Sequence, residues 1–478
     1  MFDPYEIMYN GRTYHGNVTL KEYHIVERNG EHCLFRVRDM AALPISKTLA
    51  ETFLHIMPGP GVLIPDAVMQ TLRACGLPVD EASEAAAPAA PVKLATRPVV
   101  NIFLFLAQAC NMHCVYCYGN AGEYGHRGVM SEETALASVE WLMENSLDAK
   151  KIYVTFFGGE PLLKFPLMKQ VIAYAKEQAA TRGKDVKFNL TTNATLLTNK
   201  VITFLKAEQI NPLISFDGPA EIQNRQRPFK NGRGSYNRVY ANVQKLRAVI
   251  SNLTARATVY GDGDPFAIRQ EMEKAGFIDC RLSLTKPAFL QGVTRSEDKT
   301  ARQEAAERML TYRRSEAVRL FSAITKRTLD TAGPSVELAI LSGLVDGHKR
   351  YIGCGIGRGM HAVSVNGDIY PCPCFVGMED TRLGHIRDYQ VGEINNYHRA
   401  VVDNLPVCRA CWVRYFCGGG CFYNNHASTG DMHRPDLVFC HGMKIMCEDL
   451  IHGWCKLNES DKAWMRKQLE KLDPERPL

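Results

Sequence analysis

Three cysteines within one short segment constrain this chain more than any other feature. Cys110, Cys114 and Cys117 are separated by three residues and then by two. Thiolates at this spacing can hold three irons of a [4Fe–4S] cluster, and no fourth cysteine is near, so one iron keeps an open position. Chance core thiols or a structural zinc site are the alternatives, although a closed zinc site needs a fourth ligand.

An open iron position has a specific chemical use. It can chelate the amino and carboxylate groups of S-adenosylmethionine and pass an electron into the sulfonium, which yields a radical that abstracts unactivated hydrogens. The cysteine spacing, with the aromatic Tyr116 just before the last cysteine, resembles the signature of the radical S-adenosylmethionine (radical SAM) superfamily. The resemblance implies a [4Fe–4S] cluster on these three cysteines and places Tyr116 in the cofactor pocket.

The amino-acid composition and net charge argue against several classes of protein. The 478 residues are 46% hydrophobic and 23% charged, which is ordinary for a globular chain of two or three domains. A formal charge of +6 without a dense basic stripe argues against nucleic acid as a partner. The start lacks a signal-peptide pattern, and no apolar run reaches the roughly 20 residues of a membrane helix. Sixteen cysteines then favour metal ligation in a reducing cytoplasm over disulfides.

Residues 1–80 predict a small α+β unit. Strand-like alternation covers Tyr23–Val26 and Cys33–Val37, and amphipathic helical stretches cover Lys47–Ile56 and Asp66–Cys75. This winged-helix-like pattern resembles the peptide-recognition domains that accompany peptide-modifying enzymes; a plain accessory subdomain is the alternative. An Ala/Pro-rich linker follows at residues 81–97.

Residues 98–345 alternate strand and helix signals. A helix is expected after Ser131, which serves as its N-cap with Thr134 at the third helical position. Such βα repetition predicts an α/β fold with a parallel barrel or part-barrel, and the resemblance specifies a partial (β/α)6 barrel with its chemistry at the carboxyl ends of the strands. The expected strands are Val99–Leu106, Ile152–Phe157, Val186–Thr191, Leu213–Phe216 and Thr254–Val259.

The cofactor pocket is predicted at those strand ends. Gly158 and Gly159 allow close approach of the backbone, and Glu160 can accept a hydrogen bond from an ammonium group. In the resembled superfamily this position holds the methionyl amine; a simple turn is the alternative.

Further pocket residues follow the next three strands. The resemblance implies ribose contacts at Thr192 and Asn193, and a Ser-x-Asp-Gly segment at Ser215 and Asp217. Asp217 is a candidate general base, with a structural or ribose-binding role as the alternative. Arg256 can pair with the cofactor carboxylate, or form an ion pair inside the barrel.

A second cysteine-rich region spans residues 346–460, before a C-terminal tail at 461–478. It resembles the SPASM extension, which carries two auxiliary [4Fe–4S] clusters; zinc is the alternative. Cys447 and Cys455 are expected to be core thiols. The resemblance assigns the outer cluster to Cys408, Cys411, Cys417 and Cys440, and the inner cluster to Cys354, Cys372 and Cys421. The fourth inner position is either an open iron, which we favour because it can bind a substrate thiolate, or Cys374.

The whole pattern resembles radical SAM/SPASM peptide or protein maturases, most closely the thioether-forming members. These act on six-cysteine peptides or on the small subunit of quinohaemoprotein amine dehydrogenase, and the segment Gly122–Gly125 resembles a piece of such maturases. The resemblance implies S-adenosylmethionine, three [4Fe–4S] clusters, a cysteine-containing peptide or small protein substrate, and an external flavodoxin- or ferredoxin-like electron donor. Alternatives are a sulfatase-type formylglycine maturase, a carbon–carbon crosslinking enzyme, and an iron–sulfur electron carrier or peptide-binding regulator.

Overall fold

The computed structural model of the chain describes most of its length. The described residues are 7–9, 12–14, 23–56, 98–286, 296–329, 336–357, 359–389 and 401–472. The expected linker at 81–97 and the helical stretch at Asp66–Cys75 lie outside these ranges.

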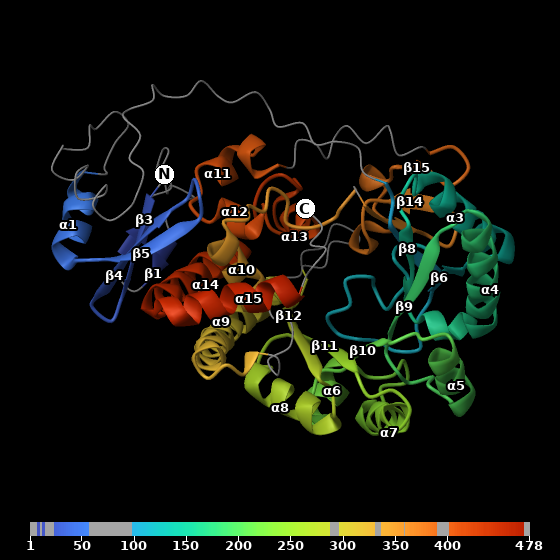
Figure 1. Ribbon diagram of the computed structural model, residues 1–478. Coiled ribbons are helices and arrows are strands. Elements are labelled where there is room, and N and C mark those ends of the chain that lie inside the picture. Colours follow the sequence, from blue (N-terminus) through green and yellow to red (C-terminus); the bar gives the residue numbers. More distant parts are fainter. Residues whose placement is uncertain are drawn as a thin grey trace.

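A ten-stranded sheet forms the centre of the larger lobe (Figure 1). Six of its strands follow one another in space in chain order, and each is parallel to the next. They are β6 (Asn101–Gln108), β8 (Lys151–Gly158), β9 (Asp185–Thr192), β10 (Leu213–Ser215), β11 (Thr254–Val259) and β12 (Asp279–Leu284). The expected α/β part-barrel is therefore confirmed, and β12 is a strand that we did not predict. A short strand, β7 (Gly128–Val129), pairs with β6 in the opposite direction.

Helices between these strands cover one side of the sheet and bury its apolar residues. Local signals fix their ends: Ser131 accepts a hydrogen bond from the Thr134 amide, as expected, and Asp264 accepts two at the start of α8. Gly276 ends α8 in the left-handed conformation. These helices are α3 (Glu132–Asn145), α4 (Phe165–Thr181), α5 (Asn199–Ala207), α6 (Ala220–Gln226), α7 (Tyr236–Arg247) and α8 (Pro265–Ala275), with a 3₁₀ turn at Pro161–Lys164.

The C-terminal region adds strands to the same sheet. β13 (Met360–Val363) pairs in parallel with β6, and β14 (Asp368–Tyr370) and β15 (Gly384–His385) continue outward as antiparallel strands. The cysteine-rich region is consequently joined to the part-barrel through backbone hydrogen bonds. Its shorter segments are α11 (Pro406–Arg409), α12 (Arg414–Cys417), α13 (Phe422–Thr429) and the 3₁₀ turns Pro373–Phe375, Glu379–Thr381 and Val402–Asn404.

The second lobe combines the two ends of the chain (Figure 1). Its N-terminal part is an antiparallel sheet of β3 (Tyr23–Arg28), β4 (Glu31–Arg36) and β5 (Ala41–Ile45), followed by α1 (Lys47–Ile56). A separate hairpin pairs β1 (Ile7–Tyr9) with β2 (Arg12–Tyr14). Its helices are α9 (Ser296–Thr325), α10 (Val336–Asp346), α14 (Leu437–Lys456) and α15 (Glu459–Leu472). The stretch expected to be a tail from residue 461 is thus largely helical.

The N-terminal sheet packs against α14 beside the cysteine-rich loops. Arg28 on β3 donates to Glu448 at 2.5 Å and to Asp449 at 3.0 Å. His24 stacks on Trp412, with ring centroids 3.7 Å apart and planes 9° from parallel. Trp412 directly follows Cys411, so the N-terminal unit contacts one of the predicted ligand loops.

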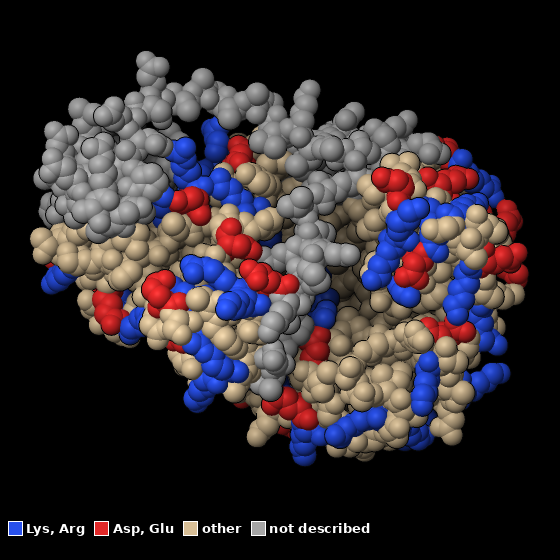
Figure 2. Space-filling view, viewed as in Figure 1, with Lys and Arg blue, Asp and Glu red and all other residues tan. Residues whose placement is uncertain are grey.

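On the face shown in Figure 2, basic and acidic side chains are interspersed, and neither kind gathers into a large charged patch. This distribution agrees with the weak net charge of +6. None of the helices in the described ranges has the length and apolar character of a membrane span.

The buried histidine His361 is expected to make the stability of the fold sensitive to acid. Its ring is fully buried on β13, 5.6 Å from the ring of Trp141, and neither ring nitrogen has a hydrogen-bond partner among the described residues. Burial lowers its pKa to about 3. Between pH of about 6.5 and 3, the imidazole therefore binds a proton in the unfolded chain but not in the folded chain. Each unit by which the pH falls in this window lowers the free energy of unfolding by about 1.4 kcal/mol.

We expect wild-type protein to lose about 2 kcal/mol more stability than His361→Leu between pH 7 and pH 5. Denaturant unfolding at the two pH values, followed by tryptophan fluorescence, measures this difference directly. Identical pH dependence in the two proteins would contradict the assignment of a buried, neutral imidazole.

Candidate functional site

The first cysteine loop begins where β6 ends, at the carboxyl edge of the sheet. Its backbone is fixed by the end of α6 and the residues that follow: the His113 amide donates to Pro228 O at 2.8 Å and the Val115 amide to Gln226 O at 3.0 Å. Gln108, at the end of β6, donates to the carbonyl of His126 at 2.9 Å. The loop is therefore held from both sides of the barrel mouth.

The three thiols of this loop share one half-buried space. Cys114 lies within electrostatic reach of Cys110 and Cys117, and Cys110 lies within electrostatic reach of Cys117. Burial raises the pKa of Cys110 to about 11 and that of Cys114 to about 12. Among the described residues no group of three His, Cys, Asp or Glu side chains is arranged to hold a single metal ion.

Gly158 and Gly159 bring the end of β8 into contact with the cysteine loop. Gly158 has φ +120°, and a Cβ on Gly159 would lie 2.1 Å from the carbonyl oxygen of Ala109. The Gly159 amide donates to Ala107 O and the Glu160 amide to Ala109 O, both at 2.9 Å. Only glycine permits this approach, which sets Glu160 within electrostatic reach of Cys110.

Glu160 is a fully buried carboxylate with an acceptor position to spare. Its Oε1 accepts from the Leu162 amide at 3.0 Å and from the Thr192 hydroxyl at 2.8 Å, while Oε2 accepts from the Asn193 amide at 2.8 Å. Burial raises its pKa to about 7. A carboxylate can accept about four hydrogen bonds, so Oε2 has room for one further donor such as an amine.

Thr192 and Asn193, which we predicted to be ribose contacts, are tied to Glu160 and to the cysteine loop. The Asn193 side chain donates to Asn111 Oδ1 at 2.9 Å and reaches Cys110 Sγ at 3.7 Å. Asn111 in turn donates to Thr195 at 2.8 Å. In this arrangement the two residues hold the carboxylate and the first thiol in a fixed relation.

Tyr116 and Asp217 belong to one buried network with Arg227. The Tyr116 hydroxyl donates to Asp217 and accepts from Arg227 Nη1 at 2.7 Å. Asp217 is fully buried, accepts from the Thr258 amide at 3.1 Å, and lies 3.8 Å from Arg227. Burial raises the pKa of Asp217. Because its oxygens already bond to Tyr116 and Thr258, the geometry favours the structural alternative for Asp217 over proton transfer.

Comparison with known proteins gives this site a family. Residues 104–274 match the family model of the radical SAM superfamily. The match spans about a third of the chain, and we call this matched part the radical SAM domain. The superfamily implies S-adenosylmethionine and a [4Fe–4S] cluster, and the converging thiols and the spare acceptor on Glu160 fit both groups.

Individual relatives extend the match. An uncharacterized protein of Methanocaldococcus jannaschii is 33% identical over 135 residues, 28% of this chain and 44% of that one. A cysteine-type anaerobic sulfatase-maturating enzyme of Clostridium novyi is 24% identical over 371 residues, covering 72% of this chain and 92% of that enzyme. The solved structure of native anSMEcpe with bound AdoMet has a TM-score of 0.60 at 18% identity, covering 75% of this chain and 100% of that one. The solved structure extends the likeness of the fold to 75% of this chain.

Arg256 and Ser215 lie on neighbouring strands of the radical SAM domain. They are paired in register on β11 and β10. Arg256 is exposed and donates from Nε to Ser283 on β12 at 3.1 Å. It lies within electrostatic reach of Cys374, so its side chain is directed toward the cysteine-rich region.

Four thiols of the cysteine-rich region gather against the radical SAM domain. Cys372 and Cys374 are hydrogen-bonded to each other, and Cys354 lies within electrostatic reach of Cys374 and Cys421. We call Cys354, Cys372, Cys374 and Cys421 the inner group. Cys374, the alternative fourth ligand, is thus positioned among the three predicted inner ligands.

The second set of thiols lies farther from the barrel, beside the N-terminal sheet. Cys440 on α14 lies within electrostatic reach of Cys408, Cys411 and Cys417. These four, the predicted outer ligands, form the outer group. Cys447, two turns along α14, is fully buried near Cys411 and Cys417, and Cys455 is hydrogen-bonded to Cys33 on β4. Both sit in the core of the second lobe, as expected.

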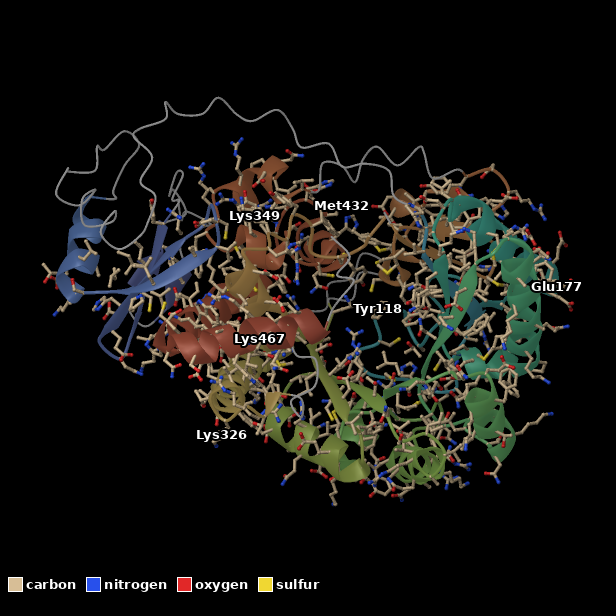
Figure 3. All side chains as sticks on the ribbon, viewed as in Figure 1. Tyr118, Glu177, Lys326, Lys349, Met432 and Lys467 are labelled. Atoms are coloured by element: carbon tan, nitrogen blue, oxygen red, sulfur yellow. The ribbon has the colours of Figure 1, made fainter. Side chains whose placement is uncertain are left out.

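Tyr118 occupies the space between the first cysteine loop and the inner group (Figure 3). Its ring is 5.8 Å from that of Tyr124 and 5.7 Å from that of Tyr423. Tyr124 belongs to the Gly122–Gly125 segment, and its carbonyl would lie 1.9 Å from a Cβ on Gly377. That segment therefore packs against the cysteine-rich region instead of forming a free surface loop.

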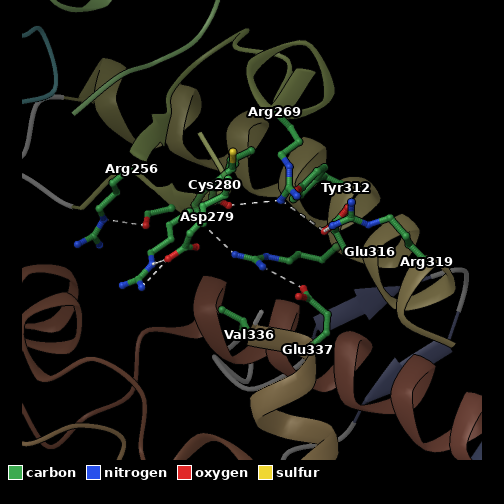
Figure 4. A pocket seen from close by; sticks show the side chains of 14 residues that line it. Arg256, Arg269, Asp279, Cys280, Tyr312, Glu316, Arg319, Val336 and Glu337 are labelled. Atoms are coloured by element: carbon green, nitrogen blue, oxygen red, sulfur yellow. Dashed lines mark hydrogen bonds and ion pairs between the residues drawn. The ribbon is translucent and has the colours of Figure 1, made fainter. Parts of the chain in front are cut away.

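A cavity of about 460 Å³ follows the outer edge of β12 (Figure 4). Arg269 donates to the carbonyl of Cys280 at 3.4 Å, and Arg313 donates to that of Leu282 at 2.9 Å and to Glu337 at 3.0 Å. Guanidinium groups thus satisfy two edge carbonyls that another strand would otherwise use. Neither Arg269 nor Arg313 was singled out by sequence reasoning, whereas Arg256, which also lines the cavity, was.

Proposed function

We propose that the chain is a radical SAM maturase that modifies a cysteine-containing peptide or small protein. The single observation that supports this best is the placement of the inner group of thiols against the mouth of the radical SAM domain. A hydrogen-abstracting centre and a sulfur-binding centre would then face the same substrate.

In this proposal Cys110, Cys114 and Cys117 hold the [4Fe–4S] cluster, and Glu160 accepts from the methionyl amine of S-adenosylmethionine. When bound, this pair of groups supplies the adenosyl radical that abstracts a substrate hydrogen. Thr192 and Asn193 orient the Glu160 carboxylate, and Arg227 and Asp217 orient Tyr116. Gly158 and Gly159 keep the strand end close enough for these contacts.

The inner and outer groups are proposed to hold two auxiliary [4Fe–4S] clusters. An open inner iron would bind a substrate thiolate and favour thioether formation. The reaction would join the carbon radical to the sulfur, the thiol proton would leave, and one electron would pass to an auxiliary cluster. An external electron donor would prime each turnover.

Formylglycine formation is the second candidate. The position of Cys374 beside Cys372 favours it, because a fully ligated inner cluster leaves no iron for a substrate thiolate. The similarity to a cysteine-type anaerobic sulfatase-maturating enzyme supports the same candidate.

The test uses anaerobically reconstituted full-length protein, S-adenosylmethionine, a chemical reductant and a pool of deuterated cysteine-containing peptides. We expect deuterium to enter 5′-deoxyadenosine. A product that has lost two hydrogens and keeps its sulfur but no free thiol indicates a thioether; a hydrazide-reactive product that has lost its sulfur indicates formylglycine. Turnover of S-adenosylmethionine without deuterium transfer from any peptide would contradict the proposal.

A further inference from the structure

Lys286 is fixed at the carboxyl end of β12, the last strand of the part-barrel. The preceding residue, Thr285, is buried and donates to Val259 O through its hydroxyl at 2.9 Å and its amide at 3.2 Å. These bonds hold the chain just beyond the strand. The backbone of Lys286 therefore has a defined position at the barrel mouth.

The side chain of Lys286 points at sulfur. Its Nζ donates to Cys421 Sγ at 3.5 Å and lies 5.4 Å from the centre of the Tyr423 ring. It is also within electrostatic reach of Cys372 and Cys374. Tyr423 is itself held in place, because its ring packs 5.6 Å from Phe375 and 5.7 Å from Tyr118. The ammonium group is thus positioned over the inner group by rigid neighbours.

No carboxylate among the described residues forms an ion pair with this ammonium group. Among the described residues, the ammonium group contacts the sulfur of Cys421 and the face of the Tyr423 ring. A half-buried cation without a carboxylate is costly unless another negative centre compensates for it. Thiolates that ligate an iron–sulfur cluster carry that negative charge.

We propose that Lys286 is a positioning residue that raises the reduction potential of an auxiliary cluster held by the inner group. Reduction adds one negative charge to such a cluster, and a cation hydrogen-bonded to a ligand sulfur stabilises the reduced form more than the oxidised one. This inference rests on the proposed function. When a substrate carbon radical joins a thiol, one carbon–sulfur bond forms, one S–H bond breaks, a proton leaves, and one electron passes to the oxidised cluster.

The position of Tyr118 agrees with this role. Its side chain lies within electrostatic reach of both Cys117 of the first loop and Cys374 of the inner group. The inner group is therefore the nearer of the two auxiliary groups to the place where the substrate radical would form, and an electron acceptor belongs there.

The test is a redox titration of reconstituted full-length protein, followed by electron paramagnetic resonance. The inner signal is identified as the one missing in Cys372→Ala. In Lys286→Met we expect at least a tenfold lower ratio of reduced to oxidised inner cluster at a fixed potential, which corresponds to about 59 mV for one electron. Lys286→Arg keeps the positive charge and is expected to restore most of the ratio.

Lys274→Met is the matched control, since Lys274 is 71% exposed on α8 and its loss changes the net charge equally. It should leave the inner signal unmoved. An unshifted potential in Lys286→Met, equal iron loss in Lys286→Met and Lys286→Arg, or a wild-type protein without an inner signal would each overturn the proposal. The titration needs no substrate, so its failure is distinguishable from a failure of deuterium transfer from peptides.

Discussion

Cys114→Ala is expected to reduce 5′-deoxyadenosine formation to background and to lower the iron content by about four atoms per chain. Only Cys110 and Cys117 then remain in this loop, and two thiols are too few to hold the cluster. No other predicted ligand can take the place of Cys114, because the others belong to the inner and outer groups. Burial holds the pKa of the Cys114 thiol at about 12, so the metal-free side chain is protonated at neutral pH and a bound iron must displace that proton. Iron analysis and a product assay under reducing, anaerobic conditions measure both effects.

Cys280→Ala provides the matched control for this experiment. Cys280 is a half-buried thiol on β12 that donates to the carbonyl of Phe277 at 3.7 Å and belongs to neither cysteine group. Its removal is expected to leave iron content and product formation near wild-type values. Full iron content together with undiminished 5′-deoxyadenosine in Cys114→Ala would contradict the assignment of the first cysteine loop.

The barrel strands could be predicted from sequence because each carries its own signal. Buried parallel strands are continuous apolar runs, and Asn101–Gln108 and Lys151–Gly158 show this clearly. β12 was missed because Asp279–Leu284 has polar residues at alternate positions and lies on an edge of the sheet. β13 was missed for a different reason: its parallel pairing with β6 joins residues more than 250 positions apart, which no local pattern encodes.

The candidate site shows the same division. Some site residues belong to motifs whose residue types and spacing indicate their function, as Cys110, Gly159 and Glu160 do. Arg227 and Lys286 belong to no motif, and a single basic residue gives no signal until the fold brings it to Tyr116 or Cys421. The N-terminal sheet could be recognised as a unit, but its contact with Trp412 depends on two segments from opposite ends of the chain.

Glu160→Gln is expected to weaken S-adenosylmethionine binding about 30- to 100-fold while the protein keeps its iron. The carboxylate accepts from three donors and has room for the methionyl amine. The glutamine amide offers only one acceptor oxygen, so its NH2 group must face either the Asn193 amide or the Leu162 and Thr192 donors. The variant therefore loses the charge that attracts the amine and also places one donor against another. Equilibrium dialysis with labelled S-adenosylmethionine measures the affinity.

Thr192→Val separates the effect of charge from that of positioning. This change removes the hydrogen bond to Glu160 Oε1 and the one that Thr192 accepts from the Ala194 amide at 3.1 Å, and it keeps both the carboxylate and the side-chain volume. Losing the neutral donor to Glu160 should weaken binding by only about fivefold, since such a bond contributes about 1 kcal/mol. Equal losses in the two variants would assign the whole effect to the orientation of Glu160. Unchanged affinity in Glu160→Gln would remove Glu160 from the cofactor pocket, because a buried carboxylate that contacts the amine cannot be neutralised without a cost.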